Sequence, residues 1–316
     1  MSSEFVLVTG AAGFVGSRLT ESLLASGRNV VALDCFLPDL YPAEIKISRW
    51  NKLESTGSAL LEKIEFDLRA DDFSMLRKYP INSVINQAAM PGLNSDWSKF
   101  APYYDCNLSA LNRLLEFSRT LPLISFVQAS TSSVYGLSAV GDESQETRPT
   151  SPYGVSKLAA EKLLLAYSEW HAVPVRILRY FSIYGPFQRP DMAYARIISC
   201  LNRDKPFTMY GDGEQKRSNT YIDDVVAATI LAELKGSAGD VMNICGNETV
   251  SLNSVIAILE ELSGKKLNRI SAEKRRGDQK DTSGVNKLAL EKLGWRATTS
   301  IKDGLEKQFL ASKERP

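Results

Sequence analysis

Histidine is almost absent from this sequence, since His171 is the single example among 316 residues. A Ser-His-Asp triad, a metal site built from several histidines and a histidine proton relay are therefore all disfavoured. His171 lies in the segment Ser-Glu-Trp-His-Ala-Val-Pro, where we expect a helix to end. A surface or capping role is its simplest interpretation.

Cysteine is also scarce, and its spacing carries no motif. Cys35, Cys106, Cys200 and Cys245 are far apart, and no pair has the spacing of a metal site, a redox dithiol or a disulfide framework. We therefore expect no bound metal and a location in the reducing cytoplasm.

Neither sign of charge dominates, and long apolar runs are missing. The chain has 38 Lys and Arg against 37 Asp and Glu, which gives no electrostatic reason to expect nucleic acid or an acidic membrane surface. The N-terminus lacks a basic segment followed by a signal-like apolar core, and no apolar run approaches the roughly 20 residues that cross a bilayer. We expect a soluble protein with no nucleic-acid and no membrane partner.

Short apolar segments alternate with longer amphipathic ones over the first half of the chain. With 44% hydrophobic residues, the chain can bury a substantial core as one large domain or two intimate ones. Amphipathic helices are expected at 15–26 and 108–119. The alternation predicts an α/β fold with a doubly wound parallel sheet of Rossmann type. The expected strands are 5–8, 30–33, 64–66, 83–86, 125–128 and 175–178.

The rhythm changes after about residue 180, where Gly and Pro become more frequent, as in Gly185-Pro186 and Gly211-Asp212-Gly213. We predict a first domain over 1–178 and a smaller, mixed α/β C-terminal substrate domain over 179–316. Because 241–244 is another strand candidate, the chain is expected to return to the first domain near 215–245.

A glycine-rich turn follows the first expected strand and opens the first helix. In Thr9-Gly10-Ala-Ala-Gly13-Phe-Val-Gly16, the glycines permit a tight turn and a close approach to a pyrophosphate, which the amides of the helix start would bind. Without this context the triplet would indicate only a turn and tight helix packing. Asp34 ends the second strand about 20 residues later, where a carboxylate binds ribose hydroxyls and repels a 2′-phosphate. The pattern predicts an NAD-binding Rossmann domain and favours NAD over NADP.

The chemistry is expected at Thr131, Tyr153 and Lys157. Tyr153 and Lys157 share one face of a helix that Ser151-Pro152 should begin. The phenol, with a usual pKa of about 10, becomes a usable base beside an ammonium and an oxidised nicotinamide. Tyr153 would then take the proton of a sugar hydroxyl while the attached hydrogen leaves as hydride, with Thr131 sharing the hydrogen bonds of the alcohol.

These motifs resemble the extended short-chain dehydrogenases/reductases, specifically the nucleotide-sugar epimerase and dehydratase family. The segments 88–92, 130–136 and 179–192 look most like those of bacterial UDP-glucuronate 4-epimerases. Family dehydratases carry two acids after Thr131, and family decarboxylases carry Glu at the position of Ser133. Because Ser132 and Ser133 stand here instead, the resemblance implies an epimerase that converts UDP-glucuronate to UDP-galacturonate through a 4-keto intermediate, without decarboxylation.

The resemblance and the motifs together give a predicted site, and the resemblance also implies a homodimer. Catalysis is assigned to Thr131, Tyr153 and Lys157. Substrate binding is assigned to Met90, Pro91, Ser132, Ser133, Ser182, Arg189, Arg217 and Arg276. Cofactor binding is assigned to Gly10, Gly13, Phe14, Val15, Gly16, Asp34, Asp67, Leu68, Ala88 and Asn107, together with Tyr153 and Lys157.

Three positions depart from the family pattern. Asn86 replaces a common His, Ser182 replaces Thr or Asn, and Ser218-Asn219 replaces Asp-Phe after Arg217. Alternatives therefore stay open: a 4-epimerase of a neutral UDP-hexose or UDP-N-acetylhexosamine, or a nucleotide-sugar dehydratase or decarboxylase. A non-catalytic NAD-binding protein is a further alternative.

Overall fold

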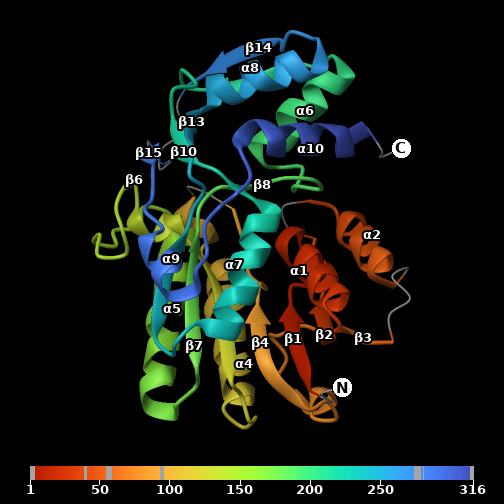
Figure 1. Cartoon of the computed structure of the whole chain (residues 1–316), viewed down its shortest axis with the longest axis vertical. Helices are drawn as coiled ribbons and strands as arrows, with labels where there is room; N and C mark the ends of the chain where they lie inside the picture. The colour runs from red at the N-terminus through yellow and green to blue at the C-terminus, as the bar shows by residue number, and fades with distance from the viewer. Residues whose placement is uncertain are drawn as a thin grey trace.

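Seven parallel strands form the central sheet, in the order β12-β7-β5-β4-β1-β2-β3 (Figure 1). The computed structural model describes residues 4–38, 41–54, 59–92, 96–273, 279 and 281–313. The strand order reverses beside β1, as in a doubly wound sheet, so the predicted fold class is confirmed. The strands are β1 (Phe5–Thr9), β2 (Asn29–Asp34), β3 (Leu61–Glu65), β4 (Ile81–Asn86), β5 (Ser125–Thr131), β7 (Val175–Tyr180) and β12 (Asp240–Ile244).

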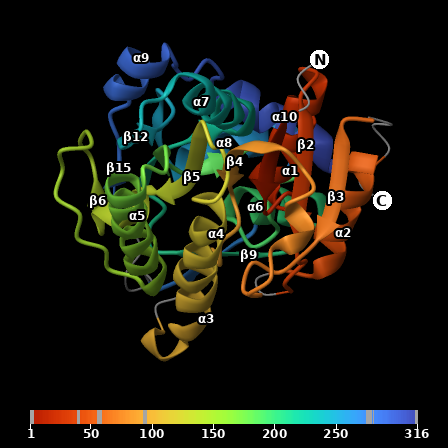
Figure 2. The same ribbon diagram turned by 90° about the horizontal axis from the view of Figure 1, so that it is seen from below.

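Helices cover both faces of this sheet (Figure 2). Along β1, Val6 and Val8 pack toward the first face and Leu7 toward the second, because successive side chains of a strand point to opposite sides. Both faces are therefore apolar, as the continuous hydrophobic strands require. The first face carries α1 (Phe14–Ala25), α7 (Ile222–Lys235) and α9 (Lys287–Leu293), and the second carries α4 (Ala110–Ser118) and α5 (Pro152–His171).

Two expected elements differ in detail from the structure. The strand expected at 64–66 runs instead from Leu61 to Glu65. Because β3 lies at the sheet edge and exposes Glu62 and Glu65, its start does not stand out as an apolar run. The helix expected at 108–119 corresponds to α4 and the end of a π-helical segment (Asp105–Ser109), and α3 (Ala101–Tyr104) precedes it, so the helical stretch begins earlier than expected. His171 is the last residue of α5 and is exposed, as expected.

A smaller group of elements lies beyond the carboxyl ends of the strands, at the top of Figure 1. Its own core joins α6 (Ala193–Arg203), α8 (Leu252–Ser263) and α10 (Ile301–Lys313). Its strands are β8 (Ile183–Tyr184) with β11 (Thr220–Tyr221), and β9 (Phe207–Tyr210) with β14 (Arg269–Ala272). A four-stranded sheet joins β13 (Thr249–Ser251), β10 (Lys216–Ser218), β15 (Asp281–Thr282) and β6 (Ser138–Ala139). The remaining helices are α2 (Ala43–Glu54) and the 3₁₀ turns Ser74–Leu76, Trp97–Lys99 and Ser132–Tyr135.

Strand β12 belongs to the large sheet and helix α7 packs on one of its faces, although both come after part of the smaller group in sequence. Strand β12 pairs in parallel with β7, from Asp240 beside Arg176 to Ile244 beside Tyr180. Glu233 of α7 is buried, accepts two hydrogen bonds from Arg28 at 2.6 and 2.9 Å and a third from Ser83 at 2.6 Å. The two halves are therefore interleaved along the chain, and the boundary at residue 178 stays a prediction.

No helix in the described ranges combines the length and the apolar composition that a membrane span needs.

Candidate active site

A cavity of about 1050 Å³ opens at the carboxyl ends of the central strands and extends under the smaller group. Two residues of the predicted site, Met90 and Asn107, do not line the cavity. Arg276 lies outside the described residues. The predicted residues that do line it are Gly10, Gly13, Phe14, Val15, Gly16, Asp34, Asp67, Leu68, Ala88, Pro91, Thr131, Ser132, Ser133, Tyr153, Lys157, Ser182, Arg189 and Arg217.

The glycine turn forms one end of this cavity and has no room for side chains. Gly10 has a φ of +66°, and a Cβ there would lie 2.8 Å from the Ala88 nitrogen. A Cβ on Gly16 would lie 2.1 Å from the Gly10 carbonyl oxygen. No side chain caps the start of α1, so its first amides face a site suited to the pyrophosphate of a dinucleotide.

Asp34 ties the glycine turn to the end of β2. One carboxylate oxygen accepts a hydrogen bond from the Ala12 amide at 3.0 Å, and the other accepts one from the Phe36 amide at 2.9 Å. The carboxylate is fixed at the cavity wall, where it suits ribose hydroxyls and repels a 2′-phosphate. The neighbouring Asp67 is bound by Arg69, which lowers the pKa of the Asp67 carboxyl.

Asn86, the first departure from the family pattern, connects three adjacent strands. Its Oδ1 accepts a hydrogen bond from the Thr9 hydroxyl, and its Nδ2 donates to Gln128 Oε1 at 2.8 Å. The residue is 2% exposed and does not line the cavity. Its amide therefore stabilises the sheet beneath the cofactor end.

Asn107 lies in the π-helical segment and supports the cavity from behind. Its Oδ1 accepts from the Met90 amide at 2.7 Å, and its Nδ2 donates to the Met90 carbonyl and to Ser156 Oγ at 3.1 and 2.9 Å. These protein groups occupy both ends of the amide, and the residue is 3% exposed. Asn107 therefore binds the backbone of Met90 and does not line the cavity.

Tyr153 and Lys157 stand on the first turns of α5, which begins as the sequence predicts. Ser151 caps the helix, since its Oγ accepts a hydrogen bond from the Gly154 amide at 3.1 Å, and Pro152 is the first helical residue. Thr131 ends β5 opposite this helix and is hydrogen-bonded to Tyr153. The three predicted catalytic residues therefore meet at one wall of the cavity.

The electrostatics of Tyr153 differ from the sequence-based expectation. Desolvation raises the pKa of the phenol, whereas the Arg189 charge and the Thr131 hydrogen bond lower it. Lys157, expected to be the activating cation, is 2% exposed, and burial lowers its own pKa to about 8. The topology also brings Arg189 to the phenol from a distant loop, an influence on Tyr153 that was not expected from the sequence, while the role of Lys157 stays a prediction.

A buried polar cluster behind Lys157 was not predicted from the sequence. Glu161, one turn beyond Lys157, binds Arg179 at 2.7 Å and accepts a hydrogen bond from Ser130. Arg179 also donates to the Tyr135 hydroxyl at 2.8 Å. Glu161 partly offsets the lowering of the Lys157 pKa by burial, so the cluster favours a charged lysine.

The far end of the cavity is lined by hydroxyl and guanidinium groups. Thr131 Oγ1 lies 3.2 Å from Ser133 Oγ and accepts a hydrogen bond from the Ser133 amide. Arg189 is held by Asp191 through two contacts of 3.0 and 2.7 Å. Ser182 completes this part of the wall. The hydroxyl groups of Thr131, Ser133 and Ser182 therefore share this cavity with Arg189 and its partner Asp191.

Gln279 connects the serine turn with the predicted diphosphate arginine and was missed from the sequence. Its side-chain amide donates to the backbone carbonyls of Ser132 and Gly136 at 3.2 and 2.8 Å. The backbone carbonyl of Gln279 accepts a hydrogen bond from Arg217 at 2.5 Å. It lies within the basic segment 265–280, where the sequence gave no reason to single it out.

The Ser218-Asn219 departure has a structural role. The Asn219 side chain accepts from the Tyr194 hydroxyl at 2.6 Å and donates to the Arg217 carbonyl at 2.9 Å, while Ser218 and Thr249 hydroxyls lie 3.1 Å apart. Neither side chain lines the cavity, so both hold the strand that carries Arg217.

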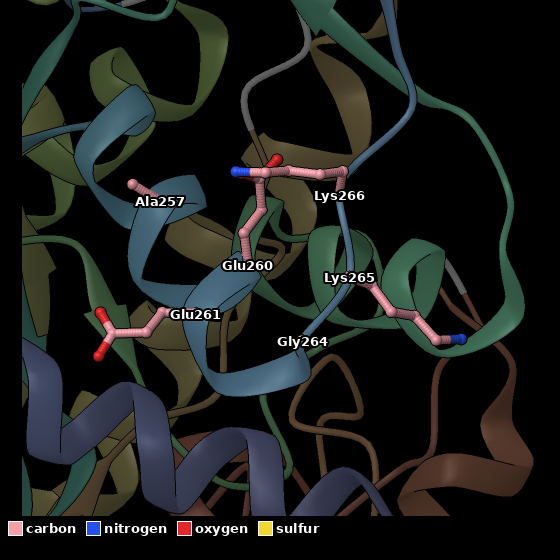
Figure 3. A pocket seen from close by; sticks show the side chains of 6 residues that line it. All are labelled: Ala257, Glu260, Glu261, Gly264, Lys265 and Lys266. Carbon is pink, nitrogen blue, oxygen red and sulfur yellow. The ribbon is translucent and has the colours of Figure 1, made fainter.

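A second, smaller pocket of about 320 Å³ lies on the surface at the end of α8 (Figure 3). Its charged groups bind neighbouring side chains: Lys266 binds Glu260 at 2.8 Å, and Lys265 binds Asp204 at 2.9 Å. In Figure 3 the Lys266 side chain reaches back to Glu260, whereas Lys265 and Glu261 point away from each other, so the lining charges do not converge on a common point. We therefore place the functional site in the large cavity.

A doubly wound sheet with this glycine turn and a Thr-Tyr-Lys centre defines a short-chain dehydrogenase/reductase of the extended type. The chain belongs to the NAD dependent epimerase/dehydratase family, whose sequence model matches residues 6–245. The resemblance stated from the sequence is confirmed, and so is NAD as the cofactor.

Three relatives show how close the similarity is. The chain is 39% identical over 311 residues to an uncharacterized UDP-glucose epimerase of Bacillus subtilis (strain 168), with 96% of each protein covered. It is 35% identical over 313 residues to a UDP-glucuronate 4-epimerase of Thermodesulfobacterium geofontis (strain OPF15), covering 98% of this chain and 96% of the relative. The crystal structure of UDP-glucuronic acid 4-epimerase from Bacillus cereus in complex with UDP-glucuronic acid and NAD matches with a TM-score of 0.92 at 38% identity, covering 98% of this chain and 99% of that one.

Proposed function

We propose that the protein inverts C4 of a UDP-sugar, with UDP-glucuronate and UDP-galacturonate as the interconverted pair. One observation carries this proposal: the hydrogen-bonded Thr131 and Tyr153 stand beside neutral Ser132 and Ser133, with Arg189 at the same cavity. The relatives that are UDP-glucuronate 4-epimerases support it. Reaction without loss of carbon dioxide is part of the proposal.

Proton transfer is assigned to Tyr153. The phenol would accept the C4 hydroxyl proton and return it, while the Thr131 hydroxyl orients the sugar oxygen. The glycine turn, Asp34 and Lys157 would hold NAD, which would supply reversible hydride transfer at C4 of the sugar. Lys157, with a pKa near 8, stays mainly protonated at neutral pH and would bind the nicotinamide ribose.

Holding the carboxylate is assigned to Ser132, Ser133, Ser182 and Arg189. Oxidation at C4 makes a β-keto acid, which decarboxylates when the breaking bond lies perpendicular to the carbonyl plane. Preorganised donors stabilise the carboxylate charge where it sits and so oppose that geometry. Because these hydroxyl groups carry no charge, they also present no acid that could assist elimination.

The diphosphate of the UDP-sugar is assigned to Arg217 and Arg276. Arg217 lines the cavity and is anchored by the Gln279 carbonyl. The planar fork of arginine suits phosphate oxygens. Met90 and Pro91 are proposed as sugar neighbours, with Met90 acting through its backbone.

A neutral UDP-hexose is the second candidate substrate, because the relative with 39% identity is a UDP-glucose epimerase. The test is a product analysis by NMR after incubation of the NAD-loaded protein with UDP-glucuronate, UDP-glucose and a UDP-N-acetylhexosamine in separate reactions. We expect UDP-galacturonate from the acid substrate and much slower turnover of the neutral ones. A UDP-pentose as the main product would reject epimerisation in favour of decarboxylation.

Tyr153→Phe supplies the matched control for that analysis. It should bind UDP-sugar and lose at least about a hundredfold in turnover, because one general acid/base contributes about 10²–10⁴. Undiminished inversion in this variant would overturn the assigned chemistry.

A homodimer and a cytoplasmic location are also proposed. The exposed helical surfaces of α4 and α5, including Trp170 with 81% exposure, are the candidate interface. Light scattering of the purified protein tests the dimer, and a monomer at micromolar concentration would reject it.

A further inference from the structure

Arg49 of helix α2 is a buried cation that the proposed chemistry does not use. The residue is 8% exposed, and its Nη2 donates a hydrogen bond of 2.6 Å to the carbonyl of Phe187. Its Nε and Nη1 are buried and make no hydrogen bond of good geometry in the described part of the chain, and the nearby Tyr41, with its ring centre 5.8 Å away, only partly offsets the lowering of the Arg49 pKa by burial. Burying an incompletely bonded charge costs stability, so packing alone gives no reason for an arginine here.

Phe187 has an unusual backbone conformation. Its φ is +63°, and the Gln188 amide donates to the Gly185 carbonyl at 3.2 Å, so 185–188 forms a tight turn with Phe187 in its third position. Turns of this kind favour Gly there, and a bulky residue costs about 1–3 kcal/mol. Strain of this size persists only where neighbouring groups hold the backbone.

Helix α2 supplies those groups from one face. Arg49 binds the Phe187 carbonyl, and Lys52, three residues further along the helix, lies with its ammonium 5.0 Å from the centre of the Phe187 ring. The same turn leads within two residues to Arg189, which contributes to the cavity wall and lowers the pKa of Tyr153. The conformation of Phe187 therefore determines the position of the Arg189 Cα atom, from which the side chain reaches the cavity.

The two arginines also act on each other directly. The positive charge of Arg189 lowers the pKa of Arg49, and both guanidinium groups interact electrostatically with Tyr41. Like charges disfavour an Arg189 rotamer that points back to α2. Asp191 holds Arg189 from the other side.

We propose that Arg49 is a positioning residue that fixes the Phe187 turn and thereby sets Arg189 against the carboxylate of the sugar. The inference rests on the proposed function, in which Arg189 binds that carboxylate. It makes α2 a determinant of the preference for an acidic over a neutral UDP-sugar.

The test compares affinities in NAD-loaded protein that also carries Tyr153→Phe, so that turnover is slowed by about a hundredfold or more during the titration. Isothermal titration gives Kd for UDP-glucuronate and for UDP-glucose in the parent, in Arg49→Met and in Arg49→Lys. We expect Arg49→Met to reduce the preference for the acid about tenfold, equivalent to about 1.4 kcal/mol, with an unchanged Kd for UDP-glucose. Arg49→Lys should recover part of the preference, because an ammonium can still donate to the Phe187 carbonyl.

A double-variant comparison separates positioning from a general structural role. In an Arg189→Met background, adding Arg49→Met should leave the ratio of the two Kd values unchanged, because the residue acts through Arg189. Arg18→Met is the matched control, since Arg18 is half exposed, binds Asp223 on the surface and should not alter the ratio.

Two results would overturn the inference. An unchanged preference for the acid in Arg49→Met, with or without an equal loss of affinity for both sugars, or a further fall of the preference in the Arg189→Met background would each reject positioning while leaving the proposed function intact. If the parent protein with Tyr153 neither turns over nor binds UDP-glucuronate, the proposed function fails and this inference fails with it. Thermal unfolding and bound NAD, measured on each variant, identify loss of fold.

Discussion

Replacing Lys157 with methionine should remove one defined contribution to the pH dependence of the free energy of unfolding. Lys157 is 2% exposed, and burial lowers the pKa of its ammonium from the ordinary 10.5 to about 8. At about 1.4 kcal/mol for each pH unit, this lowering corresponds to roughly 3 kcal/mol. The cost arises because the charged form loses its hydration when the chain folds.

The sign follows from proton binding. Between pH 8 and pH 10.5 the unfolded chain keeps the Lys157 proton, whereas the folded protein has released it. The free energy of unfolding of the wild type therefore rises with pH across this window. Methionine binds no proton, so its side chain adds no pH dependence. The free energy of unfolding of Lys157→Met minus that of the wild type should therefore be largest below pH 8 and should fall by roughly 3 kcal/mol by pH 10.5.

Equilibrium urea unfolding of both proteins, freed of NAD and measured across this range, gives the required difference. Titration of the other groups cancels to the extent that the two proteins share it. Lys162→Met, on the exposed side of the same helix, is the control and should show a much smaller pH-dependent difference. A constant difference between Lys157→Met and the wild type, or one that grows with pH, would refute the assigned desolvation.

Three further predictions test other parts of the site. Gly16→Ala would place a Cβ 2.1 Å from the Gly10 carbonyl oxygen, so we expect little NAD in the purified protein by absorbance, and a full complement would contradict the turn geometry. Glu161→Gln leaves Arg179 buried without its counter-ion and should cost about 3–5 kcal/mol in urea unfolding; a cost below about 1 kcal/mol would show that the pair is not needed. Ser133→Glu introduces an acid beside Thr131 and should produce UDP-pentose from UDP-glucuronate, whereas clean epimerisation would remove the argument from neutral donors.

The central sheet could be predicted because its strands are apolar on both faces. Strands β1 and β2 are buried beyond their first residue, and their sequences stand out as short hydrophobic runs. The edge strand β3 was placed less well, because its exposed residues include Glu62 and Glu65, which interrupt the run. Strands of two or three residues in the smaller half carry too little sequence to be identified.

The candidate site was predictable where one local motif carries it. The glycine turn, the capped start of α5 and the Tyr153-Lys157 spacing are such motifs. Arg49, Glu161 and Gln279 were missed, because their partners are distant in sequence and only the tertiary fold brings them together. For the same reason the influence of the Arg189 charge on the Tyr153 phenol was not expected, because Arg189 reaches the phenol across the fold.

The late position of β12 in the chain has a consequence for biosynthesis. The edge of the large sheet beside β7 stays open until the ribosome has added Ile244, after α6 and the strands β8 to β11 of the smaller group have already been made. An open edge offers unpaired backbone groups to other chains. Nascent chains that stop near residue 180 should therefore need chaperones and be prone to aggregation, and cutting the finished protein there should not yield two stable fragments.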